Sequence, residues 1–370
     1  FGNGENSFKQ PKKKQLYFGN AGTLGILLGL LATSSNINVK ITGDKSLSKR
    51  NMNKFIKPLS KIGCIFKPEG KKNLPLTIQG TDFGLAQHHV LNSGSAQSKA
   101  CILMAAMNLP GITTVEERKT SRNHSELILK TIGANIQLKK EKKYNSISLR
   151  GQQNLKNFSL DVPGDPSSSA FFVALTLLTK NSKLKIKNIN LNHFRTGFIR
   201  CLKSMNANIK IKNIKKKFGE TTGDIIVKSS TLKPINFPKK EVISTLDEMP
   251  IMFIIASQIK GVSKFGNIQV LRGKESDRIK KMSENLKAFG IKTHVTKNSL
   301  IIHGNPRISK SRKIIIDSTL DHRIQMSFCI LALVTGSTVL VKGCDTVKTS
   351  FPNFFSLLKK EIGAKFEIKK

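Results

Sequence analysis

The chain has 370 residues, of which 38% are hydrophobic and 23% charged, so its composition excludes an intrinsically disordered protein and allows two ordinary domains. Its most apolar stretch, residues 24–32, is far shorter than the roughly 20 residues that span a bilayer, which argues against a transmembrane helix. The 63 Lys and Arg outnumber the 23 Asp and Glu, and the formal net charge of +40 favours anionic partners such as nucleic acid, acidic lipid or a phosphorylated metabolite. On charge alone, a solvated basic surface explains the excess equally well.

Five runs of nearly continuous apolar residues predict helices that are buried on every side. They recur at residues 24–32, 100–109, 170–178, 251–259 and 325–334. A short turn and an alternating strand follow each run, as at residues 38–41 and 183–187. An amphipathic helix comes next, as at residues 50–62 and 350–362, and we expect it to cover the apolar helix from the solvent side.

After each amphipathic helix, a turn residue leads into a further strand. These turn residues recur roughly every 70–85 residues and define five copies of one repeat: Gly63, Gly133, Asn206, Gly290 and Gly363. Each copy carries its own strands and helices. This favours a layered α/β fold with helices inside and sheets outside over the alternative, a solenoid stack.

The cysteines and histidines show no spacing typical of a metal site. Four of the five cysteines lie in apolar runs, so we expect buried free thiols in a reducing compartment. We expect neither a metal nor a cofactor. The cysteines are Cys64, Cys101, Cys201, Cys329 and Cys344.

Small and capping residues stand directly ahead of the apolar helices. These segments are residues 19–23, 93–97, 165–169, 247–250 and 321–323. Asp and Ser are expected at helix N-caps simply because they satisfy free backbone N–H groups, and Pro166 suits a first helical position. On their own, these segments predict helix starts.

Cations stand ahead of three amphipathic helices, where the helix dipole disfavours them. The segments are residues 45–50, 120–124 and 272–278. Three cationic segments at equivalent positions of the repeat favour a shared site at which helix starts and cations bind an anion. Asp247 and Glu275, in the same elements, are then candidates for proton transfer beside a positive pocket.

These segments resemble the enolpyruvyl transferase family, and within it the 5-enolpyruvylshikimate-3-phosphate (EPSP) synthases. The most specific match is Asp-Glu-x-Pro at residues 247–250, followed by Lys-Glu-Ser-Asp-Arg at 274–278 and Asp-His-Arg at 321–323. Further matches extend the resemblance over nearly the whole chain, at residues 19–23, 43–50, 95–97, 164–168 and 349–352.

The resemblance implies the family's α/β fold, a two-domain inside-out α/β barrel of repeated βαβ-type units. Each domain holds three copies, and the active site lies in the cleft between the domains. Five of the six copies are found: residues 1–161 are an incomplete N-terminal domain with two copies, and residues 162–370 are a C-terminal domain with three. The remaining copy carries the family's Lys-Ser-x-Ser-x-Arg motif. We therefore expect a fragment that is inactive as it stands.

The resemblance also implies the reaction, which transfers the enolpyruvyl group of phosphoenolpyruvate to the 5-hydroxyl of shikimate 3-phosphate and releases phosphate. This step belongs to the shikimate pathway of aromatic amino-acid biosynthesis. Its chemistry is an addition followed by an elimination, through a tetrahedral intermediate. We expect a cytoplasmic monomer that needs no cofactor and binds no nucleic acid and no membrane.

The resemblance implies which residues bind each of the two substrates. Those expected to bind phosphoenolpyruvate are Asn20, Gly22, Arg50, Gln97, Arg278 and Arg323, because guanidinium groups suit carboxylate and phosphate oxygens. Those expected to bind shikimate 3-phosphate are Ser95, Ala96, Gln97, Arg122, Asp247 and Lys274. Asp247 would orient or deprotonate the 5-hydroxyl, and Glu275 would carry the proton to and from the methylene carbon. Lys274 is the third catalytic candidate.

Some positions depart from the family pattern. Ile26 stands where Arg is common, Asn123 replaces a frequent Asp, and Gly273 replaces a frequent Val. Lys348 is one residue out of register with a phosphate-facing Lys that some members carry. We expect His322 to lie behind the residues that touch the substrates.

Two alternatives remain open. A UDP-N-acetylglucosamine enolpyruvyl transferase has the same fold but uses a loop cysteine ahead of the arginine equivalent to Arg50, and residues 43–50 contain none. A basic nucleic-acid-binding protein would account for the net charge of +40, but the chain has no Trp, only two Tyr, and no interleaving of aromatic with basic residues.

Overall fold

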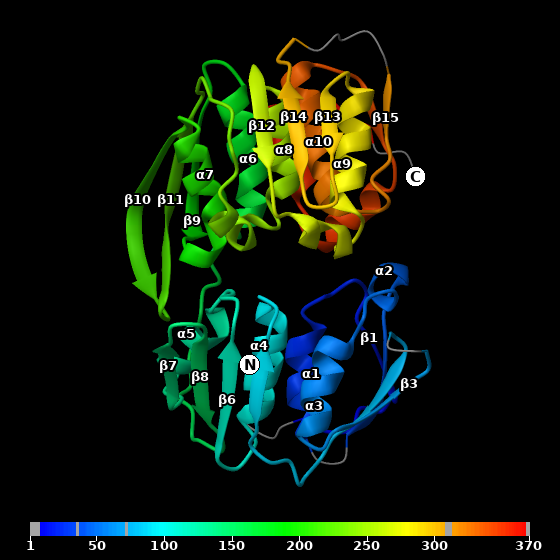
Figure 1. The fold of residues 1–370 in the computed structure, drawn as a ribbon, viewed down its shortest axis with the longest axis vertical. Coiled ribbons are helices and arrows are strands. Elements are labelled where there is room, and N and C mark those ends of the chain that lie inside the picture. Colours follow the sequence, from blue (N-terminus) through cyan, green and yellow to red (C-terminus); the bar gives the residue numbers. More distant parts are fainter. Residues whose placement is uncertain (1–7, 35–36, 71–72, 308–312, 368–370) are drawn as a thin grey trace. The chain divides into compact units, whose positions relative to one another are not determined.

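A computed structural model describes residues 8–34, 37–70, 73–307 and 313–367 of the chain. The chain divides into two compact units, Phe1–Leu160 and Asp161–Lys370. Within each, the apolar helices lie inside and the sheets lie outside (Figure 1).

The first unit contains two copies of one pattern, in which a strand, an apolar helix and a second strand precede an amphipathic helix and two more strands. The first copy consists of β1 (Gln15–Tyr17), α1 (Leu24–Ala32), β2 (Asn38–Thr42), α2 (Lys45–Ser48), α3 (Asn53–Lys61), β3 (Ile65–Pro68) and β4 (Leu76–Gln79). The second consists of β5 (His88–Leu91), α4 (Ala96–Ala106), β6 (Ile112–Glu117), α5 (His124–Thr131), β7 (Ile136–Lys140) and β8 (Asn145–Arg150). The two four-stranded sheets have the equivalent orders β1-β2-β4-β3 and β5-β6-β8-β7.

The second unit contains three further copies. The third copy of the chain consists of α6 (Pro166–Leu178), β9 (Lys183–Asn190), η1 (His193–Arg195), α7 (Gly197–Ser204), β10 (Asn208–Lys217) and β11 (Glu220–Lys228). The fourth consists of η2 (Lys239–Glu241), η3 (Ile243–Thr245), α8 (Met249–Ser257), β12 (Gly261–Phe265), η4 (Gln269–Gly273), α9 (Arg278–Ala288), β13 (Lys292–Val295) and β14 (Leu300–Gly304). The fifth consists of β15 (Ile314–Ile316), α10 (His322–Thr335), β16 (Val339–Val341), η5 (Cys344–Thr349) and α11 (Phe354–Ile362).

Parallel pairing across the apolar helix recurs in every copy. In the first, second and fifth copies, the strand before the helix pairs in parallel with the strand after it, as β1 with β2, β5 with β6 and β15 with β16. In the third and fourth copies, the first strand is reduced to a single parallel bridge, Gly164 with Ile189 and Asn236 with Lys264. The repeat is therefore a βαβ unit, which antiparallel strands extend in the first four copies. The expectation of a strand after Gly363 is wrong for the described residues 364–367, and among the described residues the sheet of the fifth copy holds only β15 and β16.

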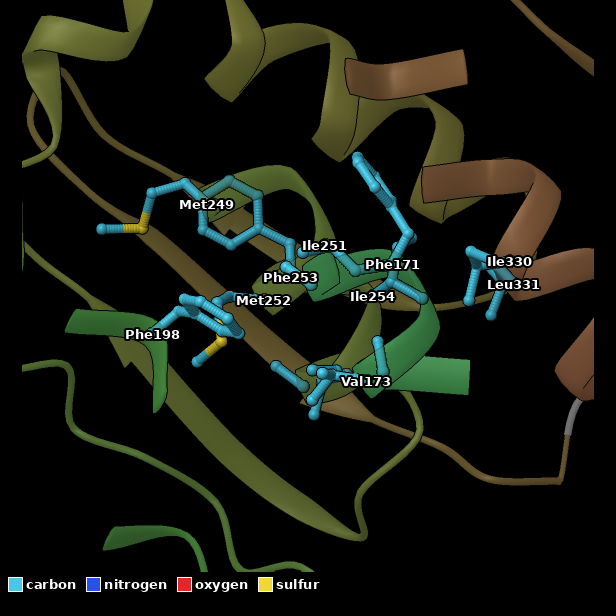
Figure 2. Close-up of a cluster of buried hydrophobic side chains, with 14 of the residues drawn as sticks. Phe171, Val173, Phe198, Met249, Ile251, Met252, Phe253, Ile254, Ile330 and Leu331 are labelled. Atoms are coloured by element: carbon cyan, nitrogen blue, oxygen red, sulfur yellow. The ribbon is translucent and has the colours of Figure 1, made fainter. Parts of the chain in front are cut away.

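The apolar helices form the cores of both units. In the first unit, α1 packs against α4 so closely that a Cβ at Gly29 would lie 2.1 Å from the backbone oxygen of Cys101. In the second unit, α6, α8 and α10 all contribute to one large hydrophobic cluster, whose members include Phe171, Met249 and Phe253 (Figure 2). The amphipathic helices bury one face only, as α3 does with Phe55 and Leu59.

The predicted helices are confirmed, with shifted ends. The apolar run at residues 24–32 is α1 with the same bounds, while the other four helices begin two to four residues earlier than the apolar runs. They do so because capping segments extend each helix: Asp165 caps α6, with Pro166 at its first turn. All five predicted turn residues adopt positive φ, with values of 110°, 94°, 72°, 77° and 69° in chain order.

The five cysteines are free thiols. The expectation of burial is confirmed for Cys64, Cys101 and Cys201 but is wrong for Cys329 and Cys344, which are half-buried. Burial raises the pKa of Cys64 and of Cys201 to about 12. In the described ranges, no helix is both long enough and apolar enough to cross a bilayer.

Candidate active site

In the first unit, four predicted phosphoenolpyruvate-binding residues lie together at the start of α1. The Nη2 of Arg50 donates to the Oδ1 of Asn20 over 2.6 Å. A Cβ at Gly22 would lie 3.0 Å from the Nη1 of Arg50 and 3.2 Å from the Nε2 of Gln97. The loop before α3, the loop before α1 and the start of α4 therefore meet around Gly22.

Lys54 joins this cluster, although the sequence analysis did not single it out. Its Nζ donates to the Oε1 of Gln97 over 3.2 Å and lies 4.7 Å from the centroid of the Phe55 ring. Lys54 stands in an amphipathic helix, where a lysine is usually solvated, so nothing in the local sequence distinguishes it from the neighbouring lysines. It adds a second cation beside Arg50.

Two of the residues predicted to bind shikimate 3-phosphate begin α4. Ser95 is the N-cap of this helix, and its hydroxyl accepts from the backbone N–H of Ser98 over 3.3 Å. Ala96 is the first helical residue, and both residues are half-buried. Arg122 is also half-buried and lies just ahead of α5. Backbone N–H groups at a helix start, with an arginine nearby, suit a phosphate.

In the second unit, Arg278 is the centre of an ion-pair network. It is the first residue of α9 and is only 1% exposed. Its Nε lies 2.9 Å from the Oδ2 of Asp321, and its Nη2 lies 2.7 Å from the Oε2 of Glu275. The hydroxyl of Ser276 also donates to Asp321, over 2.9 Å. The structure thus holds Glu275 and Arg278 together.

Two arginines near this network have guanidinium nitrogens that make no hydrogen bond to another described residue. The Nη1 of Arg278 is buried and makes no hydrogen bond there. The guanidinium of Arg323, in the first turn of α10, makes no ion pair there, although Arg323 is only 9% exposed. Buried guanidinium donors without a protein acceptor suit an anionic ligand, because an unpaired buried donor otherwise costs about 1–3 kcal/mol.

Asp247 and Lys274 flank the network. Asp247 is half-buried and lies two residues before α8. Burial acts to lower the pKa of Arg278, but the charges of Asp321 and Glu275 outweigh it and raise this pKa, and the charge of Asp247 adds a smaller effect in the same direction. Lys274 directly follows η4 and is half-buried. The interpretation of Asp247 as a helix cap is wrong, because Glu248 occupies the N-cap of α8 and makes no capping hydrogen bond.

A second polar cluster in this unit was missed by the sequence analysis. The Nη2 of Arg195 donates to the hydroxyl of Ser167 over 2.8 Å and also contacts Asp165. The hydroxyl of Ser167 in turn donates to Glu248, which is only 1% exposed. Arg195 stands ahead of α7, the position at which three other copies carry cations, so the repeat itself could have found it.

Burial and neighbouring charges shift three pKa values here. Burial, reinforced by Asp247, raises the pKa of Glu248 above its usual range. Burial acts against ionisation of Asp321, but Arg278 outweighs it and lowers the pKa of that carboxyl. Burial and the charge of Arg323 lower the pKa of His322 to about 4, so His322 is a neutral imidazole near pH 7.

The departures from the family pattern lie at exposed or open places. Ile26 is 37% exposed on α1. A Cβ at Gly273 would meet nothing within 4 Å, so no steric reason requires glycine there. The side chain of Lys348 is 71% exposed and lies 4.0 Å from Asp345. Asn123 is the N-cap of α5 but makes no side-chain capping bond.

The arrangement of inner helices and outer sheets is that of the two-domain enolpyruvyl transferases. An EPSP synthase structure from Acinetobacter baumannii superposes with a TM-score of 0.82 at 35% identity, covering 96% of this chain and 80% of that one. The enolpyruvyl transferase NikO from Streptomyces tendae superposes with a TM-score of 0.71 over 92% of this chain and 75% of that one, and at 13% identity this likeness concerns the fold alone.

Sequence comparison shows to which family of enolpyruvyl transferases the chain belongs. The sequence model of the family EPSP synthase (3-phosphoshikimate 1-carboxyvinyltransferase) matches residues 2–358. A 3-phosphoshikimate 1-carboxyvinyltransferase from Zymomonas mobilis is 40% identical over 370 residues, covering 99% of this chain and 81% of the relative. The chain therefore belongs to the EPSP synthase family. It is a transferase of the shikimate pathway, and the two alternatives, a UDP-sugar transferase and a nucleic-acid-binding protein, are not favoured.

Proposed function

We propose that the residues identified above bind the two substrates of the family, phosphoenolpyruvate and shikimate 3-phosphate, and transfer the enolpyruvyl group to the 5-hydroxyl of the latter. We also propose that the two units correspond to an N-terminal domain, residues 1–161, and a C-terminal domain, residues 162–370. The observation that carries the proposal is the Nη1 of the buried Arg278, next to Glu275, which has no hydrogen-bond partner among the residues described.

Phosphoenolpyruvate requires cations for its phosphate and its carboxylate. Arg50 in the first unit and Arg278 and Arg323 in the second are assigned to these groups, since planar guanidinium forks match both anions. Gly22 leaves open the space in front of Arg50 and Gln97, where a side chain would press on both. Asn20 orients Arg50 through their hydrogen bond of 2.6 Å.

Shikimate 3-phosphate is assigned to the start of α4 and to cations of both units. Ser95, Ala96 and Gln97 offer a hydroxyl, backbone and amide groups at a helix N-terminus, which favours a phosphate. Arg122 and Lys274 would add positive charge. Asp247 would accept the proton of the 5-hydroxyl as this oxygen attacks the central carbon of phosphoenolpyruvate.

Glu275 is assigned to the proton at the methylene carbon. In the addition step, that carbon gains a proton and becomes a methyl group while the 5-oxygen bonds to the central carbon. In the elimination step, the methyl group loses a proton to Glu275, the double bond re-forms and phosphate leaves. The Nη2 of Arg278, 2.7 Å from the Oε2 of Glu275, holds this carboxyl group in place.

A phosphate-release assay tests the proposal. It is run on residues 1–370 and on a chain extended ahead of Phe1 by a Lys-Ser-x-Ser-x-Arg copy taken from a relative. Release that requires both phosphoenolpyruvate and shikimate 3-phosphate supports the proposal. Release with UDP-N-acetylglucosamine in place of shikimate 3-phosphate, or no release from either chain, contradicts it.

We further propose that the enzyme is a monomer of a reducing, cytoplasmic compartment and that it has no nucleic-acid partner. The free thiols support the choice of compartment. Light scattering after gel filtration tests the oligomeric state, and a mass of twice 40.9 kDa would contradict it. A nanomolar, steeply salt-dependent affinity for duplex or single-stranded nucleic acid would contradict the last point.

A further inference from the structure

A buried three-residue ion cluster lies in the first unit, beside the residues assigned to shikimate 3-phosphate. Lys99 is 1% exposed, and Glu117 and Glu126 are each 2% exposed. The Nζ of Lys99 lies 3.1 Å from the Oε1 of Glu117 and 2.7 Å from the Oε1 of Glu126. One cation thus joins the second turn of α4 to the end of β6 and to the first turn of α5.

The cluster connects two predicted binding segments. On one side, the backbone N–H of Lys99 donates to the carbonyl of Ser95 over 3.2 Å, so Lys99 lies one turn below the Ser95–Gln97 helix start. On the other side, Glu117 accepts from the backbone N–H of Ser121 over 3.1 Å and from its hydroxyl. Ser121 is 2% exposed and directly precedes Arg122.

Stability alone does not account for this cluster. Replacing a buried ion pair by apolar side chains of similar volume is often neutral or stabilising, because removing charges from water is costly. The Oε2 of Glu126 has no hydrogen-bond partner in the described part of the chain. Burial raises the pKa of Glu126, although Lys99 opposes this shift. The directional bonds of the cluster instead fix the positions of α4, β6 and α5 relative to one another, which apolar packing would define less precisely.

We propose that Lys99 is a positioning residue, which through Glu117 and Ser121 fixes the distance between the Ser95–Gln97 helix start and Arg122. The inference rests on the proposed function, because it requires those two segments to bind shikimate 3-phosphate. Lys99 itself touches no substrate. Loss of the Lys99 side chain shifts Arg122 relative to the start of α4 and weakens the binding of shikimate 3-phosphate.

Steady-state kinetics of Lys99→Met tests this role in whichever chain is active in the phosphate-release assay. Met keeps the length of the side chain and removes its charge. We expect the KM for shikimate 3-phosphate to rise about tenfold or more, because a shift of Arg122 by about 1 Å weakens its contact with that substrate. The KM for phosphoenolpyruvate should change less than about twofold. Unchanged values, or equal rises in both, overturn the proposal.

Two further variants make the test decisive. Ile147→Val removes a buried methyl group from β8 in the same hydrophobic cluster as Leu129 and lowers stability without touching the ion cluster, so its KM for shikimate 3-phosphate should stay unchanged. Ser121→Ala leaves all three charges in place and removes only the hydroxyl that donates to Glu117. A several-fold rise in the KM of the Ser121→Ala variant for shikimate 3-phosphate supports the proposal, and a wild-type value overturns it. Absence of turnover from both wild-type chains, residues 1–370 and the extended chain, contradicts the proposed function instead.

Discussion

Arg278 and Asp321 form a fully buried ion pair between the starts of α9 and α10: the Nε of Arg278 lies 2.9 Å from the Oδ2 of Asp321, and their side chains are 1% and 0% exposed. The pair leaves the Nη1 of Arg278 without a hydrogen-bond partner in the part of the chain that the structure describes. Asp321 thereby holds the guanidinium in place while one edge of it stays available for an anion. The same aspartate caps α10 through the backbone N–H of Arg323, over 3.0 Å.

Asp321→Asn should lower the free energy of unfolding at pH 7 by about 3 kcal/mol, because it leaves the buried Arg278 without its main counter-charge. The pKa of Asp321 is lowered in the folded protein. Its contribution is therefore complete above the unfolded pKa of about 3.9 and is lost as the pH falls through the lower folded value. Urea unfolding at several pH values measures this. Asp317→Asn, at a 66% exposed ion-paired side chain, is the control and should change little.

Gly22→Ala should raise the KM for phosphoenolpyruvate several-fold and weaken a phosphonate mimic of it. The new Cβ would lie 3.0 Å from the Nη1 of Arg50 and 3.2 Å from the Nε2 of Gln97, so both polar groups must move. Gly70→Ala is the control, since a Cβ there meets nothing within 4 Å. Equal KM values for Gly22→Ala and the control would remove Gly22 from the proposed phosphoenolpyruvate site.

Glu275→Gln and Asp247→Ala should each reduce kcat by about 10²–10⁴-fold, the usual contribution of a positioned acid or base, while the fold stays intact by circular dichroism. Glu284→Gln is a matched control, because Glu284 is 46% exposed on α9 and pairs only with Lys280 and Lys281 among the described residues. A kcat near the wild-type value in either site variant would refute the role given to that residue.

Gly151→Ala should lower the free energy of unfolding by about 1–3 kcal/mol, the cost of overpacking a tight contact. A Cβ there would lie 1.9 Å from the backbone oxygen of Leu109, at the end of the second apolar segment. Gly304 meets Ile259 at the same distance in the fourth copy, so the contact belongs to the repeat. Thermal unfolding measures the effect. A midpoint equal to that of Gly70→Ala would show that this glycine is not required.

The sequence predicts those features that depend on near neighbours. The apolar run of α1 and the turn residue Gly63 are recognisable because hydrophobic pattern and backbone preference are local. The caps Ser95, Asp165 and Asp321 accept backbone N–H groups within three residues of themselves. Such contacts can be predicted because both partners lie close together in the sequence.

The features that could not be predicted depend on distant residues. Glu248 stands at the start of α8 but bonds Ser167, which is 81 positions away, so a tertiary contact replaces the capping role expected there. Arg195 meets Asp165 across 30 positions. The partners of Lys99 lie 18 and 27 positions further along, and a lysine in an apolar helix gives no sign of which carboxylates it will meet.

Deuterium incorporation from D₂O into the product tests the central claim most directly. The proposed addition delivers a solvent-derived proton to the methylene carbon, and the elimination through Glu275 removes one from the resulting methyl group. We therefore predict deuterium in the methylene group of the enolpyruvyl product formed from phosphoenolpyruvate and shikimate 3-phosphate, measured by mass spectrometry together with phosphate release. Phosphate release that yields a product free of deuterium would contradict the account.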